Sequence, residues 1–170
     1  HRRQIDEIRS LRQLLNAHAG PGTTLRVRLH PGDQPDDYAA LAGIPGIELQ
    51  HDTDLATSIR SAWLGITNIS SFALNCLAEG RICLISPASV QPPRSARNLT
   101  RLPGPRLASH ADLPHWLQRL DSPPRYQAAL DDAIHQLQPW FDAIATDTGA
   151  RRLADFIRRS ARRPPHATSL

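Results

Sequence analysis

Two short segments of the sequence carry side chains suited to binding an anion. His30 is the first candidate, and the run 68–71, with Asn68, Ser70 and Ser71, is the second. A histidine ring donates a hydrogen bond in either protonation state. A helix that starts in the run 68–71 presents free backbone N–H groups beside the serine hydroxyls, an arrangement that favours a phosphate. Both segments therefore predict phosphate binding.

The same residues also have ordinary structural interpretations. Ser70 or Ser71 can cap a helix without any ligand, and His30 can bond a loop carbonyl instead. Arginines in a proline-rich segment are a further candidate for closing over a phosphate, and a solvated basic loop is the alternative. These arginines are Arg94, Arg97 and Arg101. The sequence leaves these alternatives open.

Metal and cofactor chemistry has no support in the spacing of the titratable residues. His110 and His115 are five residues apart, which does not place two zinc ligands on one helix face. The sequence holds no Walker loop, no dinucleotide-binding glycine motif and no nucleophile elbow. Cys76 and Cys83 form no CxxC pair, and their apolar neighbours predict buried, reduced thiols in a cytoplasmic protein. We expect neither a metal ion nor a cofactor.

The elements that must position these residues alternate between strands and helices. Apolar alternation and apolar runs predict strands over 23–30, 47–50, 63–67, 81–85 and 106–109. Helical spacing predicts helices over 3–18, 36–42, 112–120, 126–144 and 151–163, with breaks at 86–105 and at Pro123-Pro124. Two further helices are predicted, one capped by Asp52 or Asp54 and running to 62, the other capped by Ser70 or Ser71 and running to 78. This order favours a three-layer, Rossmann-like α/β domain with a mainly parallel sheet and a helical C-terminus.

The predicted organisation is a single domain with an appended C-terminal segment. We expect the domain over residues 1–150, with a mobile proline-rich loop at 86–105, and an arginine-rich helix and tail at 151–170. In an open parallel sheet, ligands bind beyond the carboxyl ends of the strands. His30 and Asn68 each come at the carboxyl end of a predicted strand. Both candidate segments are therefore expected at one edge of the sheet.

Positive charge is concentrated at the C-terminal end of the sequence. The chain of 170 residues has a formal net charge of +4 at pH 7, and six arginines but only one aspartate lie in 151–170. The rest of the chain is close to neutral, which argues against a nucleic-acid partner. The arginines surround an apolar side of the predicted helix 151–163. That helix is expected either to touch the inner face of an anionic membrane or to dock on the protein itself.

Short motifs give the chain a resemblance to a known family. Arg26-Val27-Arg28-Leu29-His30-Pro31 and the later run Ser70-Ser71-Phe72-Ala73-Leu74-Asn75 are the residues that carry it. Over about residues 23–90, the sequence resembles the C-terminal, donor-binding half of GT-B glycosyltransferases of bacterial capsule and lipooligosaccharide synthesis. The sialyltransferases and polysialyltransferases with His-Pro and Ser-Ser motifs are the nearest group.

The resemblance implies a site and a substrate. Nucleotide and phosphate binding would fall to His30, Asn68, Ser70, Ser71 and Asn75, with His30 also stabilising the leaving phosphate. The donor would be a nucleotide sugar, CMP-linked in the nearest group, and the acceptor a glycan or a lipid-linked glycan. The general base would come from an N-terminal half, so the resemblance implies a part of a larger enzyme in the cytoplasm.

One departure from the family pattern concerns a carboxylate. These families often place a glutamate five residues after the first serine, where this sequence has Asn75, and Glu79 is the alternative carboxylate. Loss of that charge keeps a second interpretation open. It is a non-catalytic Rossmann-like module that docks on a protein partner or an anionic membrane. A small α/β enzyme of another class, such as part of a sugar epimerase, is a third.

Overall fold

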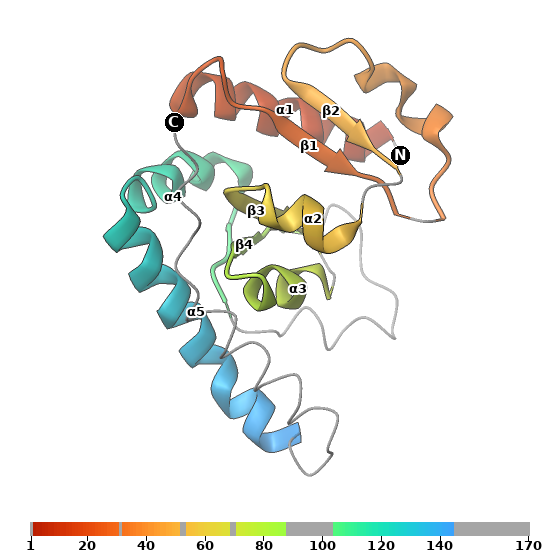
Figure 1. Cartoon of the computed structure of the whole chain (residues 1–170). Coiled ribbons are helices and arrows are strands. Elements are labelled where there is room, and N and C mark those ends of the chain that lie inside the picture. The colour runs from red at the N-terminus through yellow and green to blue at the C-terminus, as the bar shows by residue number, and fades with distance from the viewer. Residues whose placement is uncertain (1, 31, 52–53, 69–70, 88–103, 145–170) are drawn as a thin grey trace. The chain divides into compact units, whose positions relative to one another are not determined.

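The computed structural model describes residues 2–30, 32–51, 54–68, 71–87 and 104–144, with side chains as far as 138. The chain forms two compact units. The first comprises His1–Asp54 and Ser109–Gln118, and the second comprises Leu55–Ala108 and Arg119–Leu170. Each unit contains one pair of parallel strands together with helices (Figure 1). The expected mixed α/β class with parallel strand pairing is therefore confirmed.

The first unit pairs two short parallel strands beside a long helix. Leu25 pairs with Ile47 at one end of the ladder, and Arg28 pairs with Gln50 at the other. The elements are α1 (Arg2–Ala19), β1 (Leu25–Arg28), a 3₁₀ segment (Pro35–Leu41), β2 (Ile47–Gln50), a second 3₁₀ segment (His110–Asp112) and most of α4 (Leu113–Arg119).

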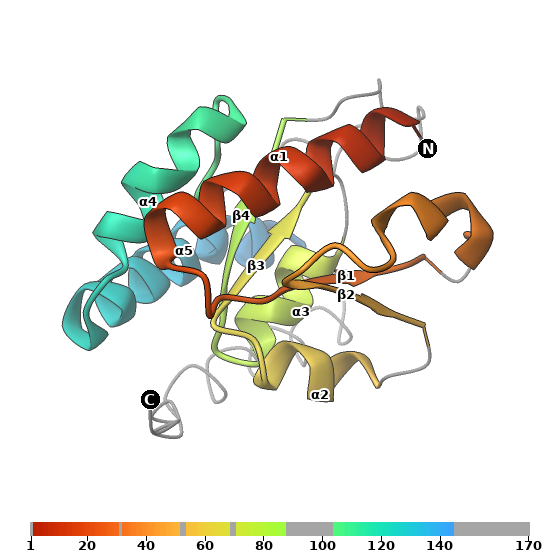
Figure 2. The same cartoon turned by 90° about the horizontal axis from the view of Figure 1, so that it is seen from above.

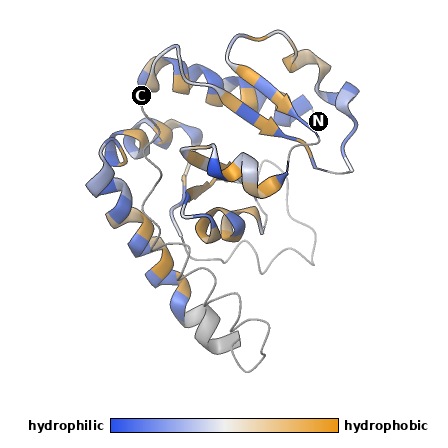
Figure 3. Ribbon diagram, viewed as in Figure 1, coloured by the Kyte–Doolittle hydropathy of each residue, from blue (hydrophilic) through white to orange (hydrophobic). Residues whose placement is uncertain are grey.

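The core of the first unit explains why these elements form. Leu29, Tyr38 and Leu41 are buried together, and Ile5 and Ile8 of α1 pack against them. Ile5 and Ile8 are three residues apart and therefore share one face of the helix. Hydrophobic and hydrophilic residues alternate along α1 (Figure 3). Strand β1 buries part of Leu25 and Val27 while it exposes Arg26 and Arg28.

A buried arginine fastens the loop that leads into β2. The Arg12 guanidinium donates hydrogen bonds to the backbone oxygens of Thr23 (2.9 Å) and Pro45 (3.0 Å). Gly46 lies under this guanidinium with a φ of +77°, and a Cβ at that position would overlap it. The left-handed φ and the close approach both require glycine there.

The second unit also contains a parallel strand pair. Leu64 pairs with Ile82, and Thr67 pairs with Ile85. Helix α3 contacts both strands, and α5 contacts β4. Figure 2 shows β3 and β4 side by side. The elements are α2 (Leu55–Arg60), β3 (Leu64–Thr67), α3 (Phe72–Ala78), β4 (Ile82–Ile85) and α5 (Pro123–Ile144).

Strand β4 is the most deeply buried strand that the structure describes. All four of its residues are buried. Successive residues of a strand point to opposite faces, so both faces of β4 are covered. On one of them, Cys83 packs with Ile59, Ala73 and Cys76 from α2 and α3. The continuous apolar run Ile82–Ile85 is typical of such a strand.

Two of the predicted elements need correction. The predicted strand 106–109 is reduced to a single parallel bridge between Ile85 and Arg106. The predicted break at Pro123-Pro124 is wrong, because α5 begins at Pro123. A proline fits the first turn of a helix, where its missing N–H has no helical partner.

Several predicted features lie outside the described residues. They are most of the proline-rich loop, at 88–103, and the arginine-rich segment 151–170 with its helix 151–163. Among the helices that the structure does describe, none combines the length and the apolar character that a membrane span requires.

Candidate functional site

His30 is held in a tight turn just past the carboxyl end of β1. Its backbone oxygen accepts a hydrogen bond from the Asp33 N–H at 2.8 Å. Its own backbone N–H donates to Asp33 Oδ2 at 3.0 Å. The Asp33 residue thus fixes the His30 backbone through two hydrogen bonds, although the His30 side chain itself is exposed.

The same turn sets the tautomer of the His30 ring. The Gly32 N–H donates a hydrogen bond to His30 Nδ1 at 3.1 Å. Because Nδ1 accepts this bond, the proton of the neutral imidazole is on Nε2. If His30 donates a hydrogen bond to a ligand, as the sequence predicts, the donor is the Nε2–H of its exposed ring.

Tyr38 supports this turn from the buried side. Its hydroxyl lies 3.2 Å from Asp33 Oδ2, and the residue itself is buried. Burial, followed by the charge of Asp33, raises the pKa of Tyr38 to about 12. The hydroxyl therefore keeps its proton at neutral pH and donates to the carboxylate. Tyr38 and Asp33 together position His30. Tyr38 is buried and Asp33 is half-buried, whereas His30 is exposed.

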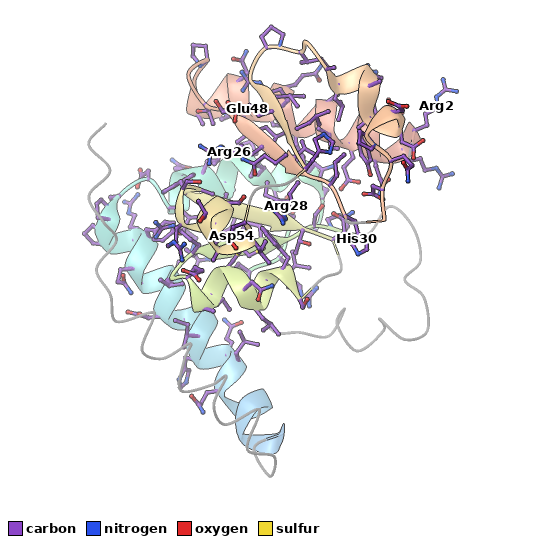
Figure 4. The ribbon with its side chains drawn as sticks, turned by 45° about the vertical axis from the view of Figure 1, so that its right-hand side comes forward. Arg2, Arg26, Arg28, His30, Glu48 and Asp54 are labelled. Carbon is purple, nitrogen blue, oxygen red and sulfur yellow. The ribbon has the colours of Figure 1, made fainter. Side chains whose placement is uncertain are left out.

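The outward face of β1 adds positive charge beside His30. Arg26 and Arg28 precede His30 by four and two residues and are exposed, as is His30. Figure 4 shows the three in succession along β1 and past its end. Arg26 forms an ion pair with Glu48 of β2, at 3.5 Å. Arg28 is nearer to His30 in sequence than Arg26 is. Its neighbour in the strand register is Gln50, and it too has an interaction partner.

In the second unit, Ser71 and Asn75 share one face of α3. Ser71 is the residue before the helix, and its backbone oxygen accepts a hydrogen bond from the Asn75 N–H at 3.1 Å. Both side chains are exposed. The Ser71 side chain makes no capping hydrogen bond to the helix. The structure therefore places a hydroxyl and an amide one turn apart on the surface, and Ser71 does not act as an ordinary side-chain cap.

The remaining candidates divide into three cases. Asn68 is half-buried after β3 and has an interaction partner. Ser70 lies outside the described residues, as do Arg94, Arg97 and Arg101. Glu79, the alternative carboxylate, forms an ion pair with Arg60 at 3.3 Å. The carboxylate of Glu79 is therefore paired with an arginine of the second unit.

The structure groups these residues by unit. His30 belongs to the first unit, whereas Asn68, Ser71 and Asn75 belong to the second. Among the described residues, no three His, Cys, Asp or Glu side chains gather where they could hold a metal ion. No protein-family model, curated protein or solved structure matches this chain.

Some residues of the first unit lie beside or support His30, although the sequence predicted no such role for them. Arg28 was predicted only as part of a motif. The polar residues at 26, 28 and 30 alternate along the strand, and this alternation is the signal that places Arg28 on the same side as His30. Asp33 and Tyr38 carry a weaker signal. An aspartate just after His-Pro-Gly is typical of a turn, but nothing in the sequence shows that Tyr38 reaches that carboxylate.

Proposed function

We propose that this chain binds a nucleotide sugar and serves as the donor-binding part of a glycosyltransferase of bacterial surface-polysaccharide synthesis. The observation that carries the proposal is the His30 ring. Its Nδ1 is occupied by the Gly32 amide, and its Nε2–H is an exposed donor past the end of a parallel strand. Phosphate oxygens are acceptors only, so this donor suits the phosphate of a nucleotide.

The charges on β1 support the same ligand. The Arg28 side chain is exposed two residues before His30, on the same face of the strand. An arginine binds phosphate oxygens through charge-assisted hydrogen bonds. During transfer of the sugar, negative charge develops on the departing phosphate, and donors fixed in advance stabilise it. In this proposal, His30 stabilises the leaving phosphate through a hydrogen bond, and the positive charge of Arg28 stabilises the same phosphate.

The second unit offers hydrogen-bonding groups of its own for a nucleotide. Ser71 and Asn75 offer an exposed hydroxyl and an exposed amide on one face of α3, and the proposal includes Asn68 and Ser70. An asparagine can bond a ribose hydroxyl through its amide. The acceptor would be a glycan or a lipid-linked glycan. The base that activates it is assigned to another part of the enzyme.

The experiment is calorimetric titration of the whole chain with CMP, UDP, GDP and CDP. We expect one of them to bind, and we expect His30→Ala to weaken it at least about tenfold, or about 1.4 kcal/mol. His18→Ala is the matched control, because His18 is an exposed histidine in the last turn of α1. It should bind like the wild type. Failure of all four nucleotides, or equal binding by His30→Ala, would contradict the proposal.

A second comparison tests the role of β1. Arg26 and Arg28 lie on the same exposed face, but Arg28 is two residues from His30 whereas Arg26 is four residues away. Arg28→Ala should therefore weaken nucleotide binding by several-fold, whereas Arg26→Ala should change it little. The reverse order would remove Arg28 from the proposed site.

A docking module is the second candidate, and the exposure of Trp63 favours it. Trp63 is 49% exposed, the largest apolar side chain so placed among the described residues. Exposed tryptophans are enriched at protein interfaces. If no nucleotide binds, if the chain sediments as a self-associated species, and if Trp63→Ala sediments as a monomer, this candidate replaces the first.

A further inference from the structure

Two cysteines from different elements meet above one glycine of the second unit. Cys76 of α3 is 1% exposed and Cys83 of β4 is 3% exposed. A Cβ built on Gly65 of β3 would lie 2.8 Å from Cys76 Sγ and 3.2 Å from Cys83 Sγ. Gly65 is also the register partner of Cys83. The missing side chain at Gly65 is what allows both sulfur atoms to occupy the same small space.

The two thiols also influence each other. The neighbouring Cys76 thiol, followed by burial, raises the pKa of Cys83. Both sulfur atoms lie within 3.2 Å of one point, the Cβ position of Gly65, so they border the same small space. Both cysteines are free thiols in this structure. The pair is therefore reduced, adjacent and closed off by Ile59, Ala73 and Phe72.

We propose that Cys76 and Cys83 form a reversible disulfide bond within the chain when a peroxide reaches them. A peroxide is small enough to enter when α3 opens locally from the strands. The two sulfurs border the same small space beside Gly65, and a disulfide brings them to about 2.05 Å from each other. This site is independent of the proposed nucleotide-binding function.

The chemical step balances without any other reactant. Cys76 lies on α3, the element that opens, and its sulfur attacks one peroxide oxygen as a thiolate while the thiol proton passes to the departing oxygen. The O–O bond breaks, giving a sulfenic acid on Cys76 and one water molecule. The Cys83 sulfur then attacks the Cys76 sulfur, the S–S bond forms, and the S–O bond breaks to release a second water. The two thiols lose two electrons, which reduce the peroxide, and their protons leave in the water.

The bond would join the end of α3 to the middle of β4. Cys76 directly follows Asn75, and the chain between the two cysteines makes the tight turn at Gly80, whose φ is +67°. Closing this loop removes freedom from the unfolded chain more than from the folded one. Oxidation should therefore raise the urea midpoint of unfolding, and dithiothreitol should restore the original value.

The test is hydrogen peroxide treatment of the whole chain, followed by intact-mass measurement and thiol counting. We expect the loss of two hydrogen masses and of both thiols, with full recovery after dithiothreitol. Loss of the two thiols with gain of oxygen, formation of a disulfide dimer, or no loss of thiols would each overturn the proposal. This test needs no variant and so does not depend on how a substitution folds.

Single variants then identify the order of the step. Cys83→Ser should trap the sulfenic acid on Cys76, which dimedone labels, whereas Cys76→Ser should give little label on Cys83. Gly65→Ala is the geometric control, since its methyl group would occupy the space between the sulfurs. The disulfide bond should form more slowly in the Gly65→Ala variant than in the wild type, and circular dichroism should show that the variant is folded. Equal rates in the wild type and Gly65→Ala would contradict the geometry proposed here.

Discussion

The hydroxyl of Tyr126 donates a hydrogen bond to the backbone oxygen of Trp63, with 2.7 Å between the two oxygen atoms. The same hydroxyl accepts a hydrogen bond from the Ile82 N–H at 3.0 Å. Trp63 directly precedes β3, and Ile82 begins β4. The side chain from α5 therefore joins the beginnings of the two parallel strands. The rings of Tyr126 and Trp63 also lie 6.0 Å apart.

Tyr126→Phe tests the contribution of this hydroxyl to stability. The variant keeps the buried ring but leaves the Ile82 N–H and the Trp63 oxygen without their partner. An unsatisfied buried polar group costs about 1–3 kcal/mol, and we expect the free energy of unfolding to fall by that amount. Urea unfolding followed by circular dichroism measures it. A change below about 0.5 kcal/mol would show that water replaces the hydroxyl there.

Gly46 and Gly43 provide a matched pair for the role of Arg12. Both glycines have a left-handed φ, +77° and +78°, but a Cβ overlaps the Arg12 guanidinium only at Gly46. A left-handed φ costs an L-residue about 1–2 kcal/mol. We expect Gly43→Ala to lose that amount of unfolding free energy and Gly46→Ala to lose clearly more. Equal losses would show that Arg12 moves aside freely. Urea midpoints of the two variants decide between these outcomes.

Much of the local structure follows from the sequence, because periodicity alone specifies it. The apolar spacing of Ile5 and Ile8 and the alternation over 25–28 predict α1 and β1, and both are present. The predicted burial of Cys76 and Cys83 is also confirmed. These are consequences of side-chain hydropathy in a repeating backbone, which acts over a few residues.

The remaining features depend on contacts between distant residues. The segment 106–109 has strand-like composition, yet only Arg106 pairs with a strand, since the chain turns into a 3₁₀ segment at His110. Asp33 sets the backbone of His30 because of where Tyr38 packs. That three-residue arrangement has no periodic signature. The three-layer, Rossmann-like arrangement around a mainly parallel sheet stays a prediction that an experimental structure tests, and the nucleotide site stays one that binding experiments test.

Tyr38 gives stability a dependence on alkaline pH. Its pKa is about 12 in the folded chain, against an ordinary value of 10.0, so the folded state holds the proton more strongly than the unfolded state. The stabilisation is full below pH 10.0 and is lost as the pH rises from there toward about 12. Burial raises the pKa of Tyr126 as well, which adds to the same loss.

The measurement for Tyr38 is urea unfolding at about pH 9 and about pH 11. The wild type should lose stability between the two, and Tyr38→Phe should lose less because the contribution of Tyr38 is then absent, while those of Tyr126 and Cys83 remain. Tyrosinate absorbance should show the same order, with ionisation of the folded chain delayed relative to the unfolded chain. Parallel pH profiles of the two proteins would remove Tyr38 as a cause.

Ser71→Ala separates ligand binding from helix stability. An alanine in place of a serine that caps a helix usually costs about 1 kcal/mol. The Ser71 side chain makes no capping hydrogen bond, however, so we expect the unfolding free energy to change by less than about 0.5 kcal/mol. Asp112→Ala is the comparison, because its carboxylate accepts a hydrogen bond from the Ser109 N–H at 3.0 Å. It should cost about 1 kcal/mol.

A loss of nucleotide affinity in Ser71→Ala with unchanged stability would show that the hydroxyl acts on the ligand. A loss of stability as large as that of Asp112→Ala would instead assign Ser71 to the helix.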